Sequence, residues 1–233
     1  MTKGIFYSVG VGPGDPELIT LKAVRTLERC PVIAAPQTKS GEMLALSIAR
    51  QAVDMDGKEI LPLHFTMTRD RAQQHAAHEA AAQEVARRLD EGRDVAMLNL
   101  GDVSIYATAM YLAQILSERG YETRMIPGVT SFCAVAARLN ESLTDMDTTL
   151  HIVPGSSAQA LSETLSMPGT KVLMKSGRQL PGVLKELERA DLLHTSAMVC
   201  NCGLPGEQVY HDLSEYPAET SAGYFATIIV REG

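Results

Sequence analysis

Strand-like and helix-like patterns alternate along this chain, and this alternation restricts its fold more than any other feature. Short apolar segments over residues 4–9, 31–36 and 94–100 indicate buried strands. Helical patterns separate them, and a long one over residues 70–92 ends at a glycine suited to a left-handed helix cap. This order predicts an α/β fold with a mostly parallel sheet in the N-terminal part.

Two helix starts are predicted by their capping residues. Asp15 is a suitable N-cap and Pro16 a suitable first residue for a helix over residues 17–30. Apolar residues spaced for one side of that helix are Leu18, Leu21, Val24 and Leu27. A further helix is predicted from Ser104 to Arg119, ended by Gly120.

The pattern restarts after Gly120 and becomes richer in strands. We therefore expect two lobes, residues 1–120 and 121–233, with a mixed or partly antiparallel sheet in the second. A ligand is expected in the cleft between two such lobes.

Composition excludes several classes of protein. A formal net charge of −7 argues against nucleic-acid binding, which favours a basic surface. No apolar run approaches the roughly 18 residues of a membrane span, and the N-terminal segment lacks the pattern of a secretion signal. The 4 cysteines show no Cys-x-x-Cys spacing, so a reducing cytoplasm and no protein-held metal are expected.

Three glycine-containing loops each follow a predicted strand and precede a predicted helix. They are residues 10–16 (GVGPGDP), 100–106 (LGDVSIY) and 126–132 (IPGVTSF). Loops of this kind gather at the carboxyl edge of an α/β sheet, where ligands bind. Pro13 has no N–H to offer a phosphate, and no Gly-Lys-Ser/Thr is present, so the loops favour a neutral or cationic ligand over a triphosphate.

Polar residues in the second and third loops are candidates for ligand contact. Asp102 is predicted near a helix N-terminus, where the helix dipole stabilises a negative charge. The Thr130 and Ser131 hydroxyls either cap the following helix or contact a ligand, and both uses are open. Each loop alone could also be a simple turn and cap.

Taken together, the loops resemble the tetrapyrrole methylase family of two-lobed methyltransferases that use S-adenosylmethionine. The family's Gly-x-Gly-Pro-Gly-Asp, Gly-Asp-x-x-x-Tyr/Phe and Pro-Gly-Val/Ile-Thr-Ser/Ala are all present, with Val103 where much of the family has proline. Within the family, several segments resemble the members that methylate C20 of precorrin-2 or cobalt-precorrin-2 in cobalamin biosynthesis. These segments are residues 44–50, 64–67, 128–138, 203–208 and 224–230.

The resemblance implies a set of residues that bind S-adenosylmethionine and its product S-adenosylhomocysteine. Asp102 and Tyr106 are also the candidates for substrate positioning or proton handling. The implied cofactor contacts are Gly12, Pro13, Leu100, Gly101, Asp102, Ile105, Tyr106, Thr130, Ser131, Lys175 and Cys202.

A tetrapyrrole substrate carries many carboxylates, so cations are expected near the site despite the acidic total charge. Solvated surface charge is the alternative for each of them. The candidates are Lys39, His64, Arg69, Arg71, Arg138 and Arg178. His75, His78 and Glu79 have helical ligand spacing, but a solvated helix face explains them more simply. The resemblance also implies a homodimer.

Other functions remain open at this point. They are methylation of another macrocycle carbon, diphthine synthesis, a nicotinamide-dependent oxidoreductase and a non-catalytic tetrapyrrole carrier. The oxidoreductase is disfavoured because Asp15 stands where a dinucleotide fingerprint needs its third glycine.

Overall fold

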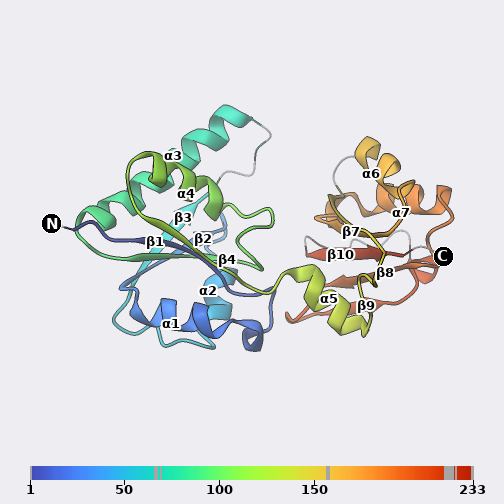
Figure 1. Cartoon of the computed structure of the whole chain (residues 1–233), viewed down its shortest axis with the longest axis horizontal. Helices are drawn as coiled ribbons and strands as arrows, with labels where there is room; N and C mark the ends of the chain where they lie inside the picture. Colours follow the sequence, from blue (N-terminus) through green and yellow to red (C-terminus); the bar gives the residue numbers. More distant parts are fainter. Residues whose placement is uncertain are drawn as a thin grey trace. The chain divides into compact units, whose positions relative to one another are not determined.

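The chain forms two compact units, Met1–Thr130 and Ser131–Gly233 (Figure 1). The computed structural model describes residues 2–65, 68, 70–155, 158–217, 223 and 225–231, with the backbone alone at 158–160 and 178. The division lies after the boundary expected at residue 120. The reason is that β5 (Thr123–Ile126) pairs with β1 (Phe6–Gly10) in the sheet of the first unit.

The sheet of the first unit has five parallel strands in the order β3-β2-β4-β1-β5. The remaining strands are β2 (Val32–Gln37), β3 (Glu59–His64) and β4 (Val95–Asn99). Every residue of β1 and β4 is buried, as expected for central parallel strands covered on both faces. The parallel sheet predicted for the N-terminal part is confirmed.

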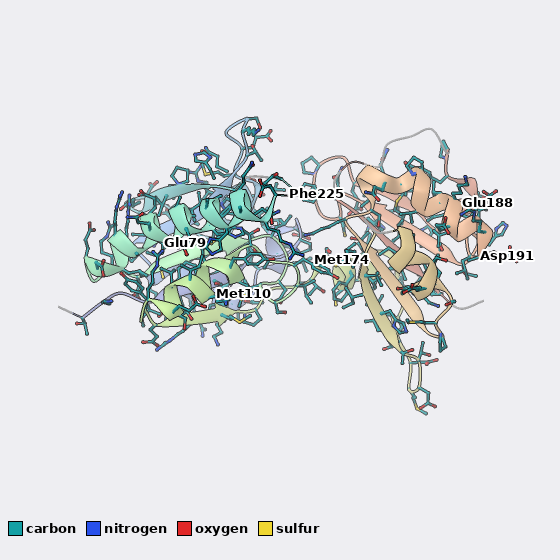
Figure 2. The ribbon with its side chains drawn as sticks, turned by 90° about the horizontal axis from the view of Figure 1, so that it is seen from above. Glu79, Met110, Met174, Glu188, Asp191 and Phe225 are labelled. Carbon is teal, nitrogen blue, oxygen red and sulfur yellow. The ribbon has the colours of Figure 1, made fainter. Side chains whose placement is uncertain are left out.

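Helices cover both faces of this sheet. In Figure 1, α1 (Leu21–Arg29) and α2 (Leu44–Ala49) lie on one side, while α3 (Arg71–Asp90) and α4 (Ala109–Glu118) lie on the other. Glu79 of α3 and Met110 of α4 can be located in Figure 2. The core beneath α3 and α4 joins residues of both helices to the strands, among them Phe6, Leu89, Met97 and Leu112.

The C-terminal cap of α3 follows the sequence prediction, and its N-terminal cap is Asp70. Asp70 Oδ1 accepts hydrogen bonds from the N–H groups of Ala72 and Gln73, at 2.9 and 3.3 Å. Gly92 ends the helix in the left-handed conformation, with a φ of 76°, and its N–H donates to the Leu89 carbonyl at 3.0 Å.

The first helix begins later than predicted. Asp15 and Pro16 start only a short 3₁₀ turn (Pro16–Leu18), and Thr20 caps α1, its Oγ1 accepting from the Ala23 N–H at 3.1 Å. Leu21 is 73% exposed, so the prediction that it lines the apolar side is wrong. The helix predicted from Ser104 likewise starts only at Ala109, and the residues before it form a longer loop.

The second unit holds a mixed five-stranded sheet in the order β6-β7-β10-β8-β9. Its strands are β6 (Leu150–Pro154), β7 (Thr170–Met174), β8 (Ser196–Cys200), β9 (Gln208–Tyr210) and β10 (Ala226–Val230). The β6–β7 pair is parallel and the other three are antiparallel, so the predicted mixed sheet is confirmed.

Helices also cover this second sheet on both faces. The helices are α5 (Ser131–Leu139), α6 (Ala158–Leu165) and α7 (Leu180–Arg189), with short 3₁₀ turns at Gly177–Gln179 and Leu213–Glu215. Met198 of β8 packs on the side of α6 and α7, while its neighbour Ala197 packs on the side of α5. Glu188 and Asp191, at the C-terminal end of α7, point away from the sheet (Figure 2).

No helix among the described residues is both long and apolar enough to cross a membrane.

Candidate functional site

The three glycine loops lie side by side because their strands are neighbours. The loops follow β4, β1 and β5, which are adjacent in the sheet and parallel. Their carboxyl ends therefore meet at one edge, as the sequence predicted.

The loops approach one another so closely that only glycine fits at their contacts. Gly12 and Gly101 exchange two backbone hydrogen bonds, at 3.3 and 2.7 Å. A Cβ added to Gly10 would lie 2.7 Å from the Gly101 carbonyl oxygen, and one added to Gly128 would overlap the same oxygen. These glycines allow the backbones of all three loops to converge around Gly101.

Asp102 connects the second loop to the third. One carboxylate oxygen accepts from the Ser104 N–H at 2.8 Å and from the Ser104 hydroxyl. The other accepts from the Gly128 N–H at 2.8 Å. The residue is 8% exposed, so this carboxylate lies inside the loop cluster and holds it together.

These hydrogen bonds keep Asp102 ionised. Burial alone would raise the pKa of this carboxyl, but the donors on Ser104, Gly128 and Val103 outweigh it and hold the pKa below its usual value. The helix-dipole reason expected from the sequence is wrong, because α4 begins only at Ala109, beyond the end of the loop. Local N–H and O–H groups stabilise the charge instead.

Two polar residues that the sequence analysis did not select support the same loops. Asn99, at the end of β4, donates from Nδ2 to the carbonyls of Leu100 at 3.0 Å and Asp102 at 3.1 Å. The Thr20 hydroxyl donates to the Pro127 carbonyl at 3.3 Å and so joins the start of α1 to the third loop. A single amide in an otherwise apolar strand was the signal for Asn99; Thr20 had none beyond its capping chemistry.

The other predicted contacts in these loops differ in exposure. Gly12 and Pro13 are buried, whereas Leu100 and Ile105 are half-buried. Tyr106 is 46% exposed and has a left-handed backbone with a φ of 50°, which is rare for a tyrosine. The loops contain no lysine or arginine, so their chemistry suits a neutral or cationic ligand better than a phosphate.

The strand order also bears on the dinucleotide alternative. Here β4 lies between β2 and β1, whereas nicotinamide-binding domains place their first strand beside their second. Together with Asp15 at the third glycine position, this order disfavours a nicotinamide-dependent oxidoreductase.

The sequence of this chain matches the model of one known protein family. Residues 6–216 match the family model described as tetrapyrrole (corrin/porphyrin) methylases. The chain belongs to this family.

Individual members of the family are similar to this chain over almost their whole length. A cobalt-precorrin-2 C(20)-methyltransferase of Salmonella typhimurium is 32% identical over 98% of this chain and 97% of its own. A precorrin-2 C(20)-methyltransferase of a Sinorhizobium species is 32% identical over 97% of this chain and 95% of its own. Among solved structures, the uroporphyrin-III C-methyltransferase of Thermus thermophilus, complexed with S-adenosylhomocysteine, has a TM-score of 0.70 at 23% identity and covers 98% of both chains.

The remaining cofactor positions implied by the methylase resemblance lie in or beside the second unit. Thr130 and Ser131 stand at the start of α5 and are half-buried. Lys175 follows β7 with a left-handed φ of 58°; partial desolvation by neighbouring atoms lowers the pKa of its ammonium group. Cys202 follows β8 and packs against the α5 side of the sheet. Their roles as cofactor contacts stay predictions.

Three of the predicted substrate cations share one edge of the first sheet. Lys39 follows β2, His64 ends β3 and Arg71 begins α3 after β3, so all three lie at the carboxyl edge that also carries the glycine loops. All three are exposed.

The other predicted cations are placed differently. Arg138 of α5 forms an ion pair with Glu207 at 2.5 Å, so a carboxylate of the chain already occupies its guanidinium. Arg69 lies outside the described residues, as does the side chain of Arg178.

Of the two histidines of α3, His78 takes part in packing and His75 is exposed. His78 stacks on Tyr111 of α4, with ring centroids 4.6 Å apart, and burial lowers its pKa. Glu79 pairs with Arg119 at the end of α4. Among the residues that the structure describes, no group of three or more His, Cys, Asp or Glu is arranged to hold a metal ion.

Proposed function

We propose that this chain transfers a methyl group from S-adenosylmethionine to C20 of precorrin-2 or cobalt-precorrin-2 in cobalamin biosynthesis. The observation that carries the proposal is the near-full-length similarity to two relatives named for this reaction, one acting on each form of the substrate. Neither relative exceeds the other in identity to this chain, so both substrates are included.

The glycine loops fit the methyl donor. They present main-chain groups, a buried Pro13 and an ionised Asp102, with no lysine or arginine that would repel a sulfonium. A fold neighbour has been solved with S-adenosylhomocysteine bound, which supports the same donor here.

The chain's contribution to the reaction is mainly positioning. When bound, the donor supplies an electrophilic methyl group on a sulfonium, which accepts the electron pair of the breaking bond. The loops around Gly101 would align that methyl with the substrate carbon, and alignment alone supplies a large share of the acceleration in such displacements. Tyr106, which is 46% exposed and lies in the same loop as Asp102, is our candidate to guide the proton that C20 must lose.

Substrate carboxylates would contact the cations at the carboxyl edge of the first sheet. Lys39, His64 and Arg71 are exposed there, and ammonium and guanidinium groups bind carboxylates through charge-assisted hydrogen bonds. We include a homodimer and a cytoplasmic location in the proposal; Cys30, Cys133, Cys200 and Cys202 all lie in the described part of the chain and form no disulfide, which suits a reducing compartment.

The test is methyl transfer to defined pigments. The purified chain is incubated with S-adenosylmethionine and metal-free or cobalt-loaded precorrin-2, and the pigment is analysed by mass spectrometry. We expect a gain of one CH₂ unit, and a ¹³C-labelled methyl group should place it at C20 by NMR. A methyl group at another carbon would assign the chain to a different methylase reaction. Pigment bound without any mass change would instead support a carrier.

A further inference from the structure

We infer that Asn99 is a positioning residue of the donor site, because it fixes the carbonyl directions on both sides of Gly101. This inference rests on the proposed function, and concerns a residue outside the three glycine loops. Asn99 is the last residue of β4, and the four residues before it in the strand are apolar and buried.

The side-chain amide of Asn99 is only 8% exposed and uses both of its N–H groups on the second loop. It donates to the Leu100 carbonyl at 3.0 Å and to the Asp102 carbonyl at 3.1 Å. Asn is one of few residues with two donors on one atom, so it can hold two carbonyls that flank a turn.

The carbonyl between these two is fixed from another direction. Gly101 accepts from the Gly12 N–H at 3.3 Å and is itself left-handed, with a φ of 75°. The main-chain oxygen of Asn99 also accepts from the Val11 N–H at 3.0 Å. Asn99 thus holds the backbone of the second loop through its side-chain amide and contacts the first loop through its main-chain oxygen. The Asp102 side chain connects the second loop to the third.

Loss of the amide would leave the Leu100 and Asp102 carbonyls without this donor. The Leu100–Gly101 peptide would then be held only through the Gly101 N–H, which donates to the Gly12 carbonyl at 2.7 Å, and the Asp102–Val103 peptide only through the Val103 N–H, which donates to the Asp102 carboxylate. With one hydrogen bond fewer on each peptide, the loop would populate conformations in which the main-chain groups no longer match the donor. Apparent affinity falls in proportion to the fraction of molecules in the binding-competent conformation. The glycine contacts and the sheet would still form, since β4 is held by its neighbours on both sides.

The experiment measures S-adenosylhomocysteine binding by calorimetry for the full chain and two variants, with thermal unfolding in parallel. Asn99→Asp keeps the shape but places a carboxylate against two carbonyl oxygens, and Asn99→Ala removes the side chain. At pH 8 we expect each to bind about tenfold more weakly or worse, the size typical of a lost buried hydrogen bond.

The pH dependence separates positioning from general destabilisation. Protonation of the carboxyl introduced by Asn99→Asp restores one donor. The affinity of this variant relative to the unaltered chain should therefore recover partly as the pH is lowered from 8 to 5.5, roughly across the range in which a buried carboxyl titrates. Asn99→Ala should show no such recovery. Asn140→Asp, the same substitution at the exposed C-terminal end of α5, is the matched control and should bind normally.

The outcomes are distinguishable. Variants that are folded and bind S-adenosylhomocysteine like the unaltered chain would overturn the inference. So would an affinity of Asn99→Asp that is reduced by the same factor at pH 8 and at pH 5.5. Variants that do not fold at 25 °C would make Asn99 a folding residue and also overturn it. If the unaltered chain itself binds neither S-adenosylhomocysteine nor S-adenosylmethionine, the proposed function fails, independently of Asn99.

Discussion

Asp102 is the residue on which the geometry of the three loops most depends. It ties the second loop to the third through Gly128 and closes the second on itself through Ser104. A carboxylate accepts at both oxygens, whereas the amide of asparagine accepts at only one.

We therefore predict that Asp102→Asn weakens S-adenosylhomocysteine binding by about tenfold or more, as expected when a buried charge-assisted hydrogen bond is lost. Titration calorimetry at neutral pH measures the affinity of both chains for S-adenosylhomocysteine. Asp56→Asn, which removes the same charge from an exposed turn of the first unit, should leave binding unchanged. Normal binding and turnover by Asp102→Asn would refute a role for this carboxylate.

The same carboxyl predicts an acid-sensitive part of the stability. Its pKa in the folded chain lies below the reference value of 3.8, so between the two values the unfolded state binds more protons than the folded state. The stabilisation is therefore complete above about pH 5 and is lost as the pH falls through the folded pKa.

Chemical unfolding from pH 7 to pH 3 tests this. The difference in unfolding free energy between the unaltered chain and Asp102→Asn should be constant near neutral pH and shrink in acid. A difference that stays constant down to pH 3 would show that the carboxyl is not stabilised as its hydrogen bonds imply.

At the scale of the secondary structure elements, replacing glycine by alanine should have opposite effects on the free energy of unfolding at two helix ends. Gly92 follows α3 with a φ of 76°, and a Cβ there would lie 3.1 Å from the Thr2 carbonyl oxygen. Gly182 lies in the first turn of α7 with no atom near its would-be Cβ.

We predict that Gly92→Ala lowers the unfolding free energy by about 1–2 kcal/mol, the cost of a left-handed alanine. Gly182→Ala should raise it by up to about 1 kcal/mol through helix propensity. Urea unfolding followed by circular dichroism compares them. Equal effects of the two substitutions would contradict the assigned helix ends.

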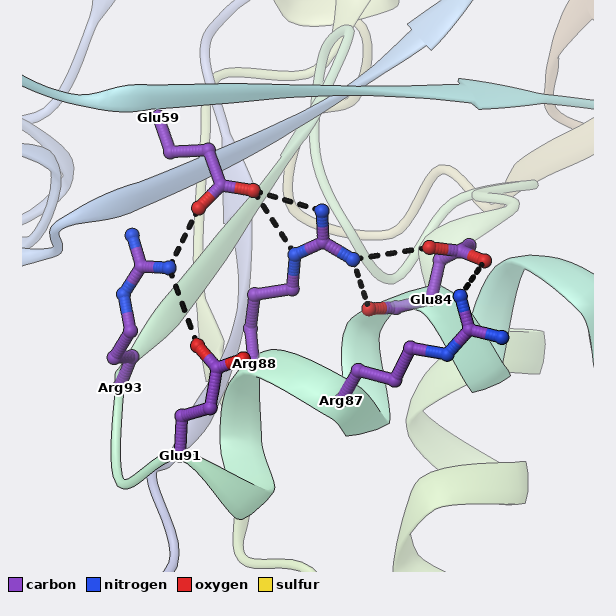
Figure 3. A network of polar contacts seen from close by, with 6 residues as sticks. All are labelled: Glu59, Glu84, Arg87, Arg88, Glu91 and Arg93. Atoms are coloured by element: carbon purple, nitrogen blue, oxygen red, sulfur yellow. Dashed lines mark hydrogen bonds and ion pairs between the residues drawn. The ribbon is translucent and has the colours of Figure 1, made fainter.

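A network of ion pairs joins β3 to the end of α3 and the segment before β4 (Figure 3). Glu59 accepts from Arg88 at 2.9 Å and from Arg93 at 2.6 Å, and its side chain is 31% exposed. Burial alone would raise the pKa of Glu59, but the hydrogen bonds from the two arginines outweigh it and lower the pKa.

Glu59→Gln should therefore cost about 1–2 kcal/mol of unfolding free energy, since two hydrogen bonds to charged groups are weakened. Glu122→Gln breaks a pair with Arg124 in which both side chains are about half exposed, at 54% and 52%, and should cost less than about 0.5 kcal/mol. The same urea experiment measures both, and equal costs would show that the network contributes no more than a surface pair.

Most elements could be predicted from the sequence because their apolar periodicity is local information. Helix starts were less predictable. Asp15 and Thr20 are both suitable caps by residue type, and the structure shows that Thr20 begins α1, because its Oγ1 accepts from the Ala23 N–H. The helix α6 had no prediction at all.

For the molecule as a whole, the sequence indicated two α/β units, but the boundary expected at residue 120 placed the fifth strand in the second unit, whereas it joins the sheet of the first. The pattern of residues 122–126 predicts a strand, yet its partner β1 is more than a hundred residues away, and periodicity carries no information on pairing. That pairing moves the division of the chain to Thr130 and brings the third loop to the other two.

The candidate site was predictable to a similar degree. Glycine spacing identified the three loops, and the family resemblance implied which of their residues contact the cofactor. The contacts that hold the loops together, from Asp102 to Gly128 and from Asn99 to the carbonyls around Gly101, depend on the fold and could not be read from spacing.

The central claim is that the loops converging on Gly101 bind a methyl donor. Isothermal titration of the full chain with S-adenosylhomocysteine, and with S-adenosylmethionine, tests it most directly. We predict saturable binding of one molecule per chain for both, weakened by Asp102→Asn and unaffected by Asp56→Asn. Absence of any heat of binding for either compound, with a folded chain in the cell, would contradict the claim.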